Sequence, residues 1–357
     1  MRIYVADLKD GDKLAQDAFN LHGLHVLSKG TALFEKEITL LLQHRVEYVD
    51  IDTSAAAVQQ APAKTDRPLE AELNPKWLTT MEPLYQEVVQ GCEQLFKEAF
   101  QTGKIEQSAA AATFQPLLDN FKLERDVVSM LLLLNTKDDY TYQHSVQVGM
   151  LSYYLAYWLG YDEQEAVQIG QAGFLHDIGK CNITDDILNK PSQLSYEEFE
   201  LIKKHPVHGH TILSNSIGPD SLAAIVALQH HERINGSGYP YGLRDNEIHP
   251  VSKIVAVADI YSAMISTRVY QQKRDLLYVL KELYKMSFTE LDANTTHTFI
   301  KHMIPNFIGK RVELQSGEMG TIIMTHPSEF FRPLVQIDDT FIDLSQERSY
   351  EVKHVFM

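Results

Sequence analysis

The chain has 357 residues and a formal net charge of −16, with 44% hydrophobic and 22% charged residues. This length suffices for two or three domains, and the acidic balance argues against non-specific binding to DNA or to anionic membranes. The two cysteines, Cys92 and Cys181, are too few and too far apart for a disulfide framework or a thiolate metal site, and they fit a reducing cytosol.

Neither a secretory signal nor a membrane span is predicted. Polar residues interrupt the first dozen positions, and the apolar runs Met130–Leu134 and Met150–Leu159 are too short to cross a bilayer. We therefore expect a cytoplasmic protein without membrane insertion. An anionic substrate of so acidic a chain would need local cations, which metal ions and a few lysines could supply.

Residues 1–60 predict a small N-terminal α/β domain. Arg2–Val5 and Glu47–Ile51 have strand patterns, and Glu35–His44 has apolar residues at helical spacing. The sequence from 53 to 75 is rich in Ala, Gln and Pro and has no apolar period, and we assign residues 61–75 to a linker.

Residues 76–308 have an almost wholly helical pattern. A first pair of helices is predicted over about 76–102 and 107–135. The Leu131–Leu134 run of this pair is interpreted as core, with a partner surface as the alternative. Five more helical segments follow, and Asp162 is the expected N-cap of the second of them.

The third of these segments is predicted to begin at Ser195, with Glu198 three residues later in a capping-box arrangement. We expect it to reach His205 before Pro206 interrupts the helix. The fourth segment is predicted to open at Pro219.

Histidine and aspartate side chains are concentrated in these five segments. Eight of the chain's fifteen histidines lie between residues 144 and 249. Apolar neighbours at helical spacing direct the candidates inward, where an unpartnered ionisable group is costly. Convergence on metal ions removes that cost, and mutual hydrogen bonding is the alternative. The candidate ligands are His144, His176, Asp177, His205, His230, His231 and Asp259.

The sequence ERINGSGYPYGL follows His231 and has the turn chemistry of a loop. Its tyrosines and Arg233 could face a ligand, and a tight connection between helices is the alternative. Residues 309–357 then alternate like short strands separated by Gly, Pro and Asp, which predicts a small all-β appendage. Its basic residues are interpreted as a solvated face, with an anion contact as the alternative.

Five motifs, taken in order, resemble the HD-GYP family of bacterial metal-dependent phosphodiesterases, which degrade cyclic di-GMP. They are HSVQV at 144, HDIGK at 176, KKHP at 203, HHERINGSGYP at 230 and VADIYSAM at 257. The match covers about residues 118–305, and several motifs in order are more specific than any single one. The resemblance implies a mainly α fold, with a multi-helix HD-type catalytic domain between the N-terminal α/β unit and the β appendage.

The resemblance also implies two metal sites that share Asp177 as a bridge. The first would be completed by His144, His176 and Asp259. The second would be completed by His205, His230 and His231. Substrate contacts are implied for Lys180, Tyr239 and Arg268.

The implied reaction is hydrolysis of cyclic di-GMP to linear pGpG. Whether hydrolysis continues from pGpG to GMP is left open. Two metals about 3.5–4 Å apart can generate a hydroxide at neutral pH and stabilise the entering and leaving oxygens. Mixed imidazole and carboxylate ligands suit iron, manganese or zinc, and the family suggests iron. Lys180 is expected to neutralise charge or to protonate the leaving group, and interaction with a helix dipole is its alternative role.

The chain departs from the family pattern at three positions. Tyr140 stands where some members have a glutamate that supplies a third metal, so we expect two divalent metals. Gln271 replaces a basic residue, although Lys273 and Arg274 are close by in sequence. Asn235 replaces an aspartate of the glycine-rich loop.

Two other functional classes remain open at this point. One is a different HD-type phosphohydrolase acting on nucleoside phosphates or an alarmone, against which the HHE and GYP motifs argue. The other is a non-catalytic module that binds a cyclic dinucleotide or a partner, against which the full set of seven ligands argues. A second copy of the chain or a signalling protein is the expected kind of protein partner.

Overall fold

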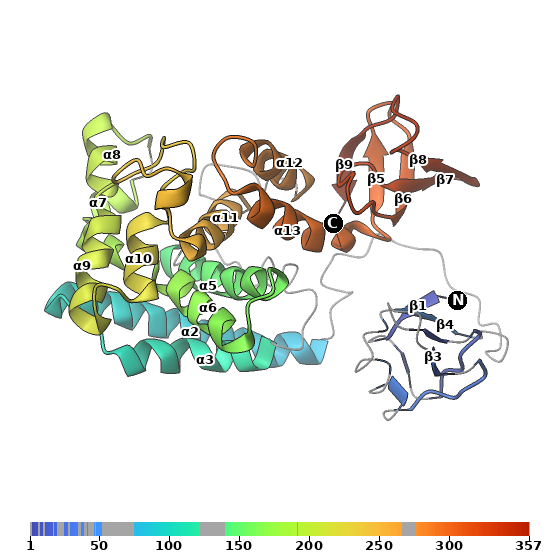
Figure 1. Ribbon diagram of the computed structural model, residues 1–357, viewed down its shortest axis with the longest axis horizontal. Coiled ribbons are helices and arrows are strands. Elements are labelled where there is room, and N and C mark those ends of the chain that lie inside the picture. The colour runs from blue at the N-terminus through green and yellow to red at the C-terminus, as the bar shows by residue number, and fades with distance from the viewer. Residues whose placement is uncertain are drawn as a thin grey trace. The chain divides into compact units, whose positions relative to one another are not determined.

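The computed structural model describes residues 2–5, 8–9, 11–16, 18–19, 25–27, 29–34, 37–38, 41, 46, 48–51, 75–121, 140–190, 192–265 and 276–356. The chain divides into two units, Met1–Pro68 and Leu69–Met357 (Figure 1). The predicted linker up to residue 74 and the Leu131–Leu134 run lie outside the described residues.

The N-terminal unit contains two short antiparallel strand pairs. Strand β1 (Arg2–Tyr4) pairs with β4 (Tyr48–Asp50), so the two strands predicted from the sequence are confirmed and are partners. Strand β2 (Ala18–Phe19) pairs with β3 (His25–Leu27). The core of this unit consists of buried aliphatic side chains, among them Val5, Leu14, Leu33, Leu41, Val49 and Ile51.

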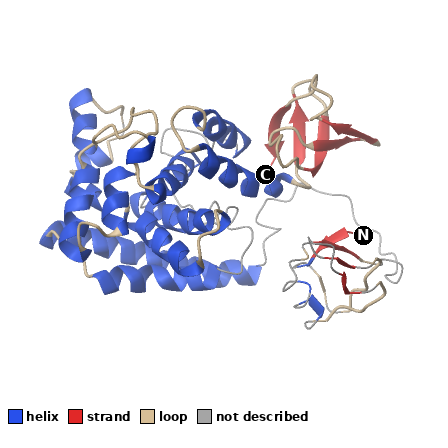
Figure 2. Cartoon of the chain, in the orientation of Figure 1, coloured by secondary structure: helices blue, strands red, loops and turns tan. Residues whose placement is uncertain are grey.

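Helices fill the middle of the chain, and strands lie toward its two sequence ends (Figure 2). Helices α5 (Tyr140–Trp158) and α6 (Glu163–Leu175) form a closely packed pair, against which α2 (Pro75–Thr102) and α3 (Gln107–Phe121) pack. Among the described residues, no helix has both the length and the apolarity needed to cross a membrane.

The predicted helix caps at Asp162 and Ser195 are confirmed. Asp162 begins α6 with a reciprocal capping box. Ser195 begins α8 (Tyr196–Ile202): its Oγ accepts from the Glu198 N–H, and the Glu198 carboxylate accepts from the Ser195 N–H. A short helix, α7 (Asp185–Leu188), precedes it.

The prediction that Pro206 interrupts a helix is wrong. Helix α8 ends at Ile202, and the His-Pro dipeptide instead begins α9 (His205–Ile217). A proline is tolerated in the first turn because the N–H that it lacks has no intrahelical partner there. The next helix, α10 (Leu222–Gln229), likewise begins after the N-cap Ser221 rather than at Pro219.

The remaining helices lead from the centre of the bundle to the C-terminal sheet. Helix α11 (Pro250–Ile265), which carries the candidate ligand Asp259, packs against α5 and is buried along most of its length. Helices α12 (Leu276–Met286) and α13 (Ala293–Met303) follow, and a short 3₁₀ helix, η5 (Ile304–Phe307), ends the helical region.

The C-terminal segment is an antiparallel sheet with the strand order β8-β7-β6-β5-β9. Its buried residues belong to the same apolar core as the helices, and the Lys281 ammonium on α12 donates to the Val352 carbonyl at 3.1 Å. The predicted mainly α fold with a β appendage is therefore confirmed. The strands are β5 (Arg311–Leu314), β6 (Met319–Met324), β7 (Leu334–Ile337), β8 (Thr340–Asp343) and β9 (Val352–Phe356).

Two arginines of the appendage contact other residues of the same segment. The Arg332 guanidinium donates to the carbonyls of Leu344 and Tyr350 at 3.1 and 3.3 Å. The guanidinium carbon of Arg311 lies 6.0 Å from the centre of the Phe356 ring. These contacts favour a structural role for both arginines.

Candidate metal centre

The seven predicted ligands come together from separate helices in the interior of the bundle. Six are buried, and His231 is half-buried. Their side chains form two adjoining groups in which the ligand atoms lie within 4.8 Å of one another. The first group is His144, His176 and Asp259, and the second is Asp177, His205, His230 and His231.

Most of these side chains are carried at helix ends. His176 is the C-cap of α6, and Asp177 is the N-cap of the 3₁₀ helix η3 (Ile178–Asn182). His205 is the first residue of α9, and His230 is the C-cap of α10. Helix ends let backbone turns bring several elements to one point, whereas the bodies of packed helices are held 8–10 Å apart.

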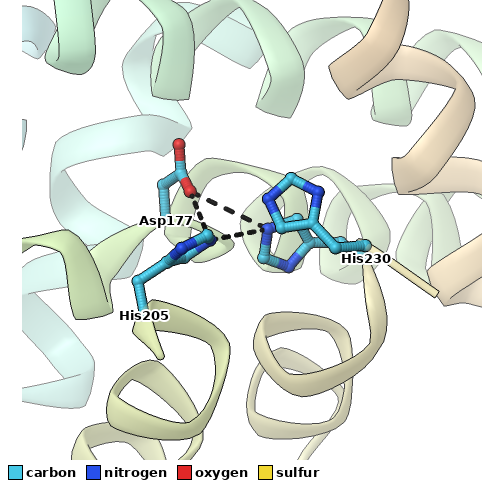
Figure 3. Close-up of side chains that lie close together, drawn as sticks. Asp177, His205 and His230 are labelled. Atoms are coloured by element: carbon cyan, nitrogen blue, oxygen red, sulfur yellow. Dashed lines mark hydrogen bonds and ion pairs between the residues drawn. The ribbon is translucent and has the colours of Figure 1, made fainter. Parts of the chain in front are cut away.

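The carboxylate of Asp177 lies between the two groups and turns one oxygen toward each. Its Oδ1 is 3.2 Å from His205 Nε2 and 3.8 Å from His230 Nε2 (Figure 3). Its Oδ2 is 3.2 Å from His176 Nε2 and 3.8 Å from His144 Nε2. A carboxylate in this position can bridge two cations.

Hydrogen bonds to the backbone fix the tautomers of three of the imidazoles. A carbonyl oxygen can only accept, so a ring nitrogen that contacts one must carry the hydrogen, and in a neutral ring the other nitrogen keeps its lone pair. In each case the contact is made by Nδ1, and Nε2 faces the cluster. The contacts are His176 to Gly173 at 2.7 Å, His205 to Ile202 at 2.7 Å and His230 to Ala227 at 3.0 Å.

Lone pairs therefore face one another inside the cluster. The Nε2 atoms of His205 and His230 are 3.3 Å apart. His176 Nε2 and Asp177 Oδ1 are buried and have no hydrogen-bond partner among the described residues. Buried polar atoms in native structures are normally partnered, and a bound cation would partner these. The residues present thus fit a metal centre.

Electrostatics favour ionised carboxylates in the cluster. Burial opposes ionisation of Asp177 and Asp259, but the surrounding imidazoles lower the pKa of both well below the ordinary value. For Asp177 the Lys180 ammonium acts in the same direction. Anionic carboxylates are the form in which these side chains bind metals.

The pKa values of four of the imidazoles are shifted, three of them downward and one upward. Burial, together with neighbouring imidazoles, lowers the pKa of His230 and His231 well below the ordinary value, and burial also lowers the pKa of His144. His176 is the exception, because the Asp177 carboxylate outweighs burial and raises its pKa. Of these four imidazoles, His176 therefore best holds a proton when no metal competes for its Nε2.

Gly179 allows the loop after His176 to approach α9 closely. A Cβ atom at this position would lie 2.1 Å from the His205 carbonyl oxygen and 2.3 Å from the Gly209 nitrogen, distances that real Cβ atoms do not show. The backbone contact holds Asp177 beside His205. This explains the glycine of the HDIGK motif.

Lys180 lies within the centre rather than at its edge. Its Nζ donates to Asp177 Oδ2 at 2.5 Å, and its side chain is only 20% exposed. This places an ammonium beside the carboxylate that separates the two groups, where it is positioned to meet an anionic substrate.

Tyr239 lies against the second group. Its ring centre is 4.6 Å from that of His231 and 6.5 Å from that of His205. The Lys203 ammonium lies 5.9 Å from the Tyr239 ring and 5.4 Å from the Phe199 ring. A second lysine, which is ion-paired with Glu200, therefore lies near the cluster beside the Tyr239 ring.

The loop after His231 is held in place by Glu232, a residue of the HHE motif for which the sequence predicted no role. Its buried carboxylate accepts from the backbone N–H groups of Tyr241 at 2.8 Å and Leu243 at 2.9 Å. A Cβ at Gly238 would lie 2.4 Å from the His231 carbonyl oxygen, so the loop folds back tightly over this residue. In the sequence, the one indication of a role for this residue is that its carboxylate directly follows two candidate metal ligands, His230 and His231.

Other loop residues also contact the backbone. Arg233 donates through Nη1 to the carbonyls of His230 and Glu232 at 3.2 and 2.9 Å. The Asn235 side chain accepts from the N–H and hydroxyl of Ser237, as an aspartate would. Arg268, the third predicted substrate contact, lies outside the described residues, as does Gln271.

The HD-domain family model matches residues 128–295. A cyclic di-GMP phosphodiesterase of Pseudomonas aeruginosa is 32% identical over 243 residues, which are 68% of this chain and 58% of the relative. A cyclic di-GMP phosphodiesterase of Thermotoga maritima is 41% identical over 178 residues, 49% of this chain and 48% of the relative.

A 3'3'-cGAMP-specific phosphodiesterase of Vibrio cholerae is 32% identical over 178 residues, 49% of this chain and 41% of the relative. The chain thus spans about half the length of the curated relatives that it matches. The segment that the family model matches includes the helices that carry the histidine and aspartate cluster. Residues 128–295 therefore match the HD-domain family, and the resemblance to the HD-GYP family is confirmed.

Proposed function

We propose that this chain is a metal-dependent phosphodiesterase that hydrolyses cyclic di-GMP to linear pGpG. The observation that carries the proposal is the Asp177 carboxylate, which divides its oxygens between two groups of imidazoles. A pair of bound divalent metals lowers the pKa of water and polarises phosphoryl oxygens, which is the chemistry that a phosphodiester requires. The names of the relatives from Pseudomonas aeruginosa and Thermotoga maritima support the choice of substrate.

One metal would be held by the first group together with the Asp177 carboxylate, and the other by the second group, to which Asp177 belongs. The first would bind His144, His176, Asp177 and Asp259, and the second would bind Asp177, His205, His230 and His231. Imidazole and carboxylate ligands suit iron, manganese or zinc, and we propose iron as the native metal.

The side chains around the centre would bind the substrate. Lys180 is beside Asp177 and would neutralise phosphate charge or protonate the leaving oxygen. Tyr239 would contact the dinucleotide beside His231, and Lys203, held against the Tyr239 ring, would meet its second phosphate. Arg268 keeps its predicted role as a substrate contact.

The expected cytoplasmic location belongs to this proposal. Both cysteines are free thiols, with Cys92 buried and Cys181 half-buried. Burial raises the pKa of Cys181 to about 11, which makes this thiol unreactive at neutral pH. Free, inert thiols suit a reducing compartment.

A time course with defined metals under anaerobic conditions tests the reaction. The full-length chain is loaded with iron, manganese or zinc and given cyclic di-GMP, 3'3'-cGAMP or an alarmone, and products are separated by chromatography. We expect cyclic di-GMP to be consumed fastest, with pGpG as the first product. Preference for 3'3'-cGAMP, as in the name of the Vibrio cholerae relative, would reassign the substrate. Binding without turnover in every metal form would support a non-catalytic module instead.

A further inference from the structure

Four buried polar side chains join two helices beside the first group. His144 and Gln147 are three residues apart on α5, and Asp259 and Ser262 are three residues apart on α11. This spacing puts both members of each pair on one helix face. His144 contacts both α11 residues: its Nε2 lies 3.0 Å from Asp259 Oδ1, and its Nδ1 lies 3.0 Å from Ser262 Oγ.

The Nδ1 partner of His144 is a serine hydroxyl, whereas His176, His205 and His230 have backbone carbonyls as their Nδ1 partners. Their Nδ1 atoms contact backbone carbonyls, which can only accept. A serine hydroxyl can donate or accept, so Ser262 alone is compatible with either tautomer of His144. If its hydroxyl donated to Nδ1, the hydrogen of the neutral ring would move to Nε2, and that atom would bond to Asp259 instead of a metal.

Gln147 removes this ambiguity. Its Oε1 lies 2.9 Å from Ser262 Oγ and accepts the single hydroxyl hydrogen. The Ser262 oxygen is then left to accept from His144 Nδ1–H. Gln147, Ser262 and His144 are all at least 96% buried, so water does not compete for these bonds.

We propose that Gln147 is a positioning residue of the metal centre, which acts through Ser262 to keep the hydrogen of His144 on Nδ1 and the lone pair of Nε2 directed at the metal. The inference rests on the metal centre of the proposed function but on neither its substrate nor its reaction. A glutamine thus defines the donor atom of a ligand that it does not touch.

Metal affinity of the full-length chain, measured by competition with a chelator, tests the proposal. Ser262→Ala and Gln147→Met should each weaken binding by about 10–100-fold, the usual range for outer-shell partners of metal-binding histidines. Ser252→Ala is the matched control and should leave the affinity unchanged. Ser252 is also a buried serine of α11, and its hydroxyl has no hydrogen-bond partner among the described residues.

The double variant separates action through Ser262 from a general loss of packing. If Gln147 acts only through Ser262, then Gln147→Met should cause no further loss of affinity in the Ser262→Ala background. Fully additive losses would overturn the proposal.

Nitrogen-15 NMR of the histidine-labelled, metal-free chain gives a second readout, with His144→Gln used for assignment. We expect His144 to carry a hydrogen on Nδ1 in the unmodified protein, where a second proton can also lie between Nε2 and the Asp259 carboxylate, and to lose this Nδ1 hydrogen in part of the Gln147→Met molecules. An unmodified protein whose Nδ1 carries no hydrogen, or an unchanged Nδ1 signal in folded Gln147→Met, would refute the proposal. Neither readout requires hydrolysis of cyclic di-GMP. A failure of the proposed reaction can therefore be distinguished from a failure of this inference.

Discussion

His205 Nε2 lies 3.2 Å from Asp177 Oδ1, although His205 donates its hydrogen through Nδ1 to the Ile202 carbonyl. The anionic carboxylate and the imidazole lone pair therefore face each other without a hydrogen between them. Such an arrangement is repulsive unless a cation or a proton lies between the two atoms. On its other side, Asp177 makes a similar approach to His176.

Because Asp177 serves both groups, its replacement should empty both metal positions. We expect Asp177→Ala to reduce metal content sharply and hydrolysis by more than about 100-fold, since changes even to outer-shell partners cost about 10–100-fold. Elemental analysis and the product assay check this. Asp177→Asn, which has nearly the same shape without the charge, should behave in the same way. Two metals per chain in either variant would rule out the bridging role.

Gly179→Ala should disturb the metal centre by displacing the backbone of α9, without removing any candidate ligand. The added methyl group would overlap the His205 carbonyl oxygen and the Gly209 nitrogen, and neither can move without shifting α9. Overpacking of this kind typically costs about 1–3 kcal/mol. Denaturant unfolding should show this loss, and chelator competition should show weaker metal binding. Cys181→Ala, in the same 3₁₀ helix, is the control and should change neither quantity appreciably.

Glu232→Ala should release the loop that carries Tyr239. The variant leaves the N–H groups of Tyr241 and Leu243 without their charged acceptor. Hydrogen bonds to charged groups contribute about 1.5–3 kcal/mol each in favourable settings. We expect KM for cyclic di-GMP to rise. Glu232→Gln, which keeps one acceptor oxygen, should give an intermediate KM, and a KM equal to that of the unmodified protein in both variants would contradict the anchoring role.

Lys203 and Lys204 form a natural pair for testing the substrate contact. Lys203 lies against the Tyr239 and Phe199 rings, whereas the adjacent Lys204 is exposed at the start of α9. Loss of one charge-assisted phosphate contact should raise KM about 10-fold in Lys203→Ala. Metal content should stay unchanged, and Lys204→Ala should resemble the unmodified protein. Equal effects of the two substitutions would indicate only long-range attraction.

The clustering of the seven histidine and aspartate side chains could be predicted from sequence, because inward-facing histidines and aspartates recur at helical positions. The sequence did not predict that several of these side chains lie at helix ends, because this depends on the residue at which each helix stops. Pro206 illustrates this difficulty. A proline in the interior of a helix disrupts it, whereas a proline in the first turn is compatible with a helix that begins there, and the sequence around His205 did not distinguish the two cases.

Supporting residues were harder to predict than ligands. Glu232, Gln147 and Ser262 are polar residues that look ordinary in sequence. Gln147 and Ser262 are buried against each other from two different helices, whereas Glu232 is buried against the backbone of its own loop. The spacing of Asp177 and the histidines likewise does not reveal that its two oxygens face different groups. Such features depend on tertiary contacts, and the contact between His144 and Ser262 joins residues 118 positions apart in the sequence.

Tyr140, the first residue of α5, should limit the centre to two metals and the reaction mainly to its first cut. It stands four residues before His144, where some relatives in the HD-GYP family have a glutamate. A phenol with an ordinary pKa of about 10 is neutral at physiological pH and is a weak metal ligand. Without a third cation there is less positive charge to hold the new terminal phosphate of pGpG for a second attack. Linear pGpG should therefore accumulate, with slow formation of GMP.

Tyr140→Glu tests this relation between metal number and product, because it restores a carboxylate at the matching position. We expect additional metal binding and faster conversion of pGpG to GMP. Thr141→Glu is the matched control: it adds the same charge one residue later, about 100° around the helix, and should change neither metal number nor product. Close to three metals per chain in the unmodified protein, or rapid GMP formation without a pGpG intermediate, would show that Tyr140 does not set this limit.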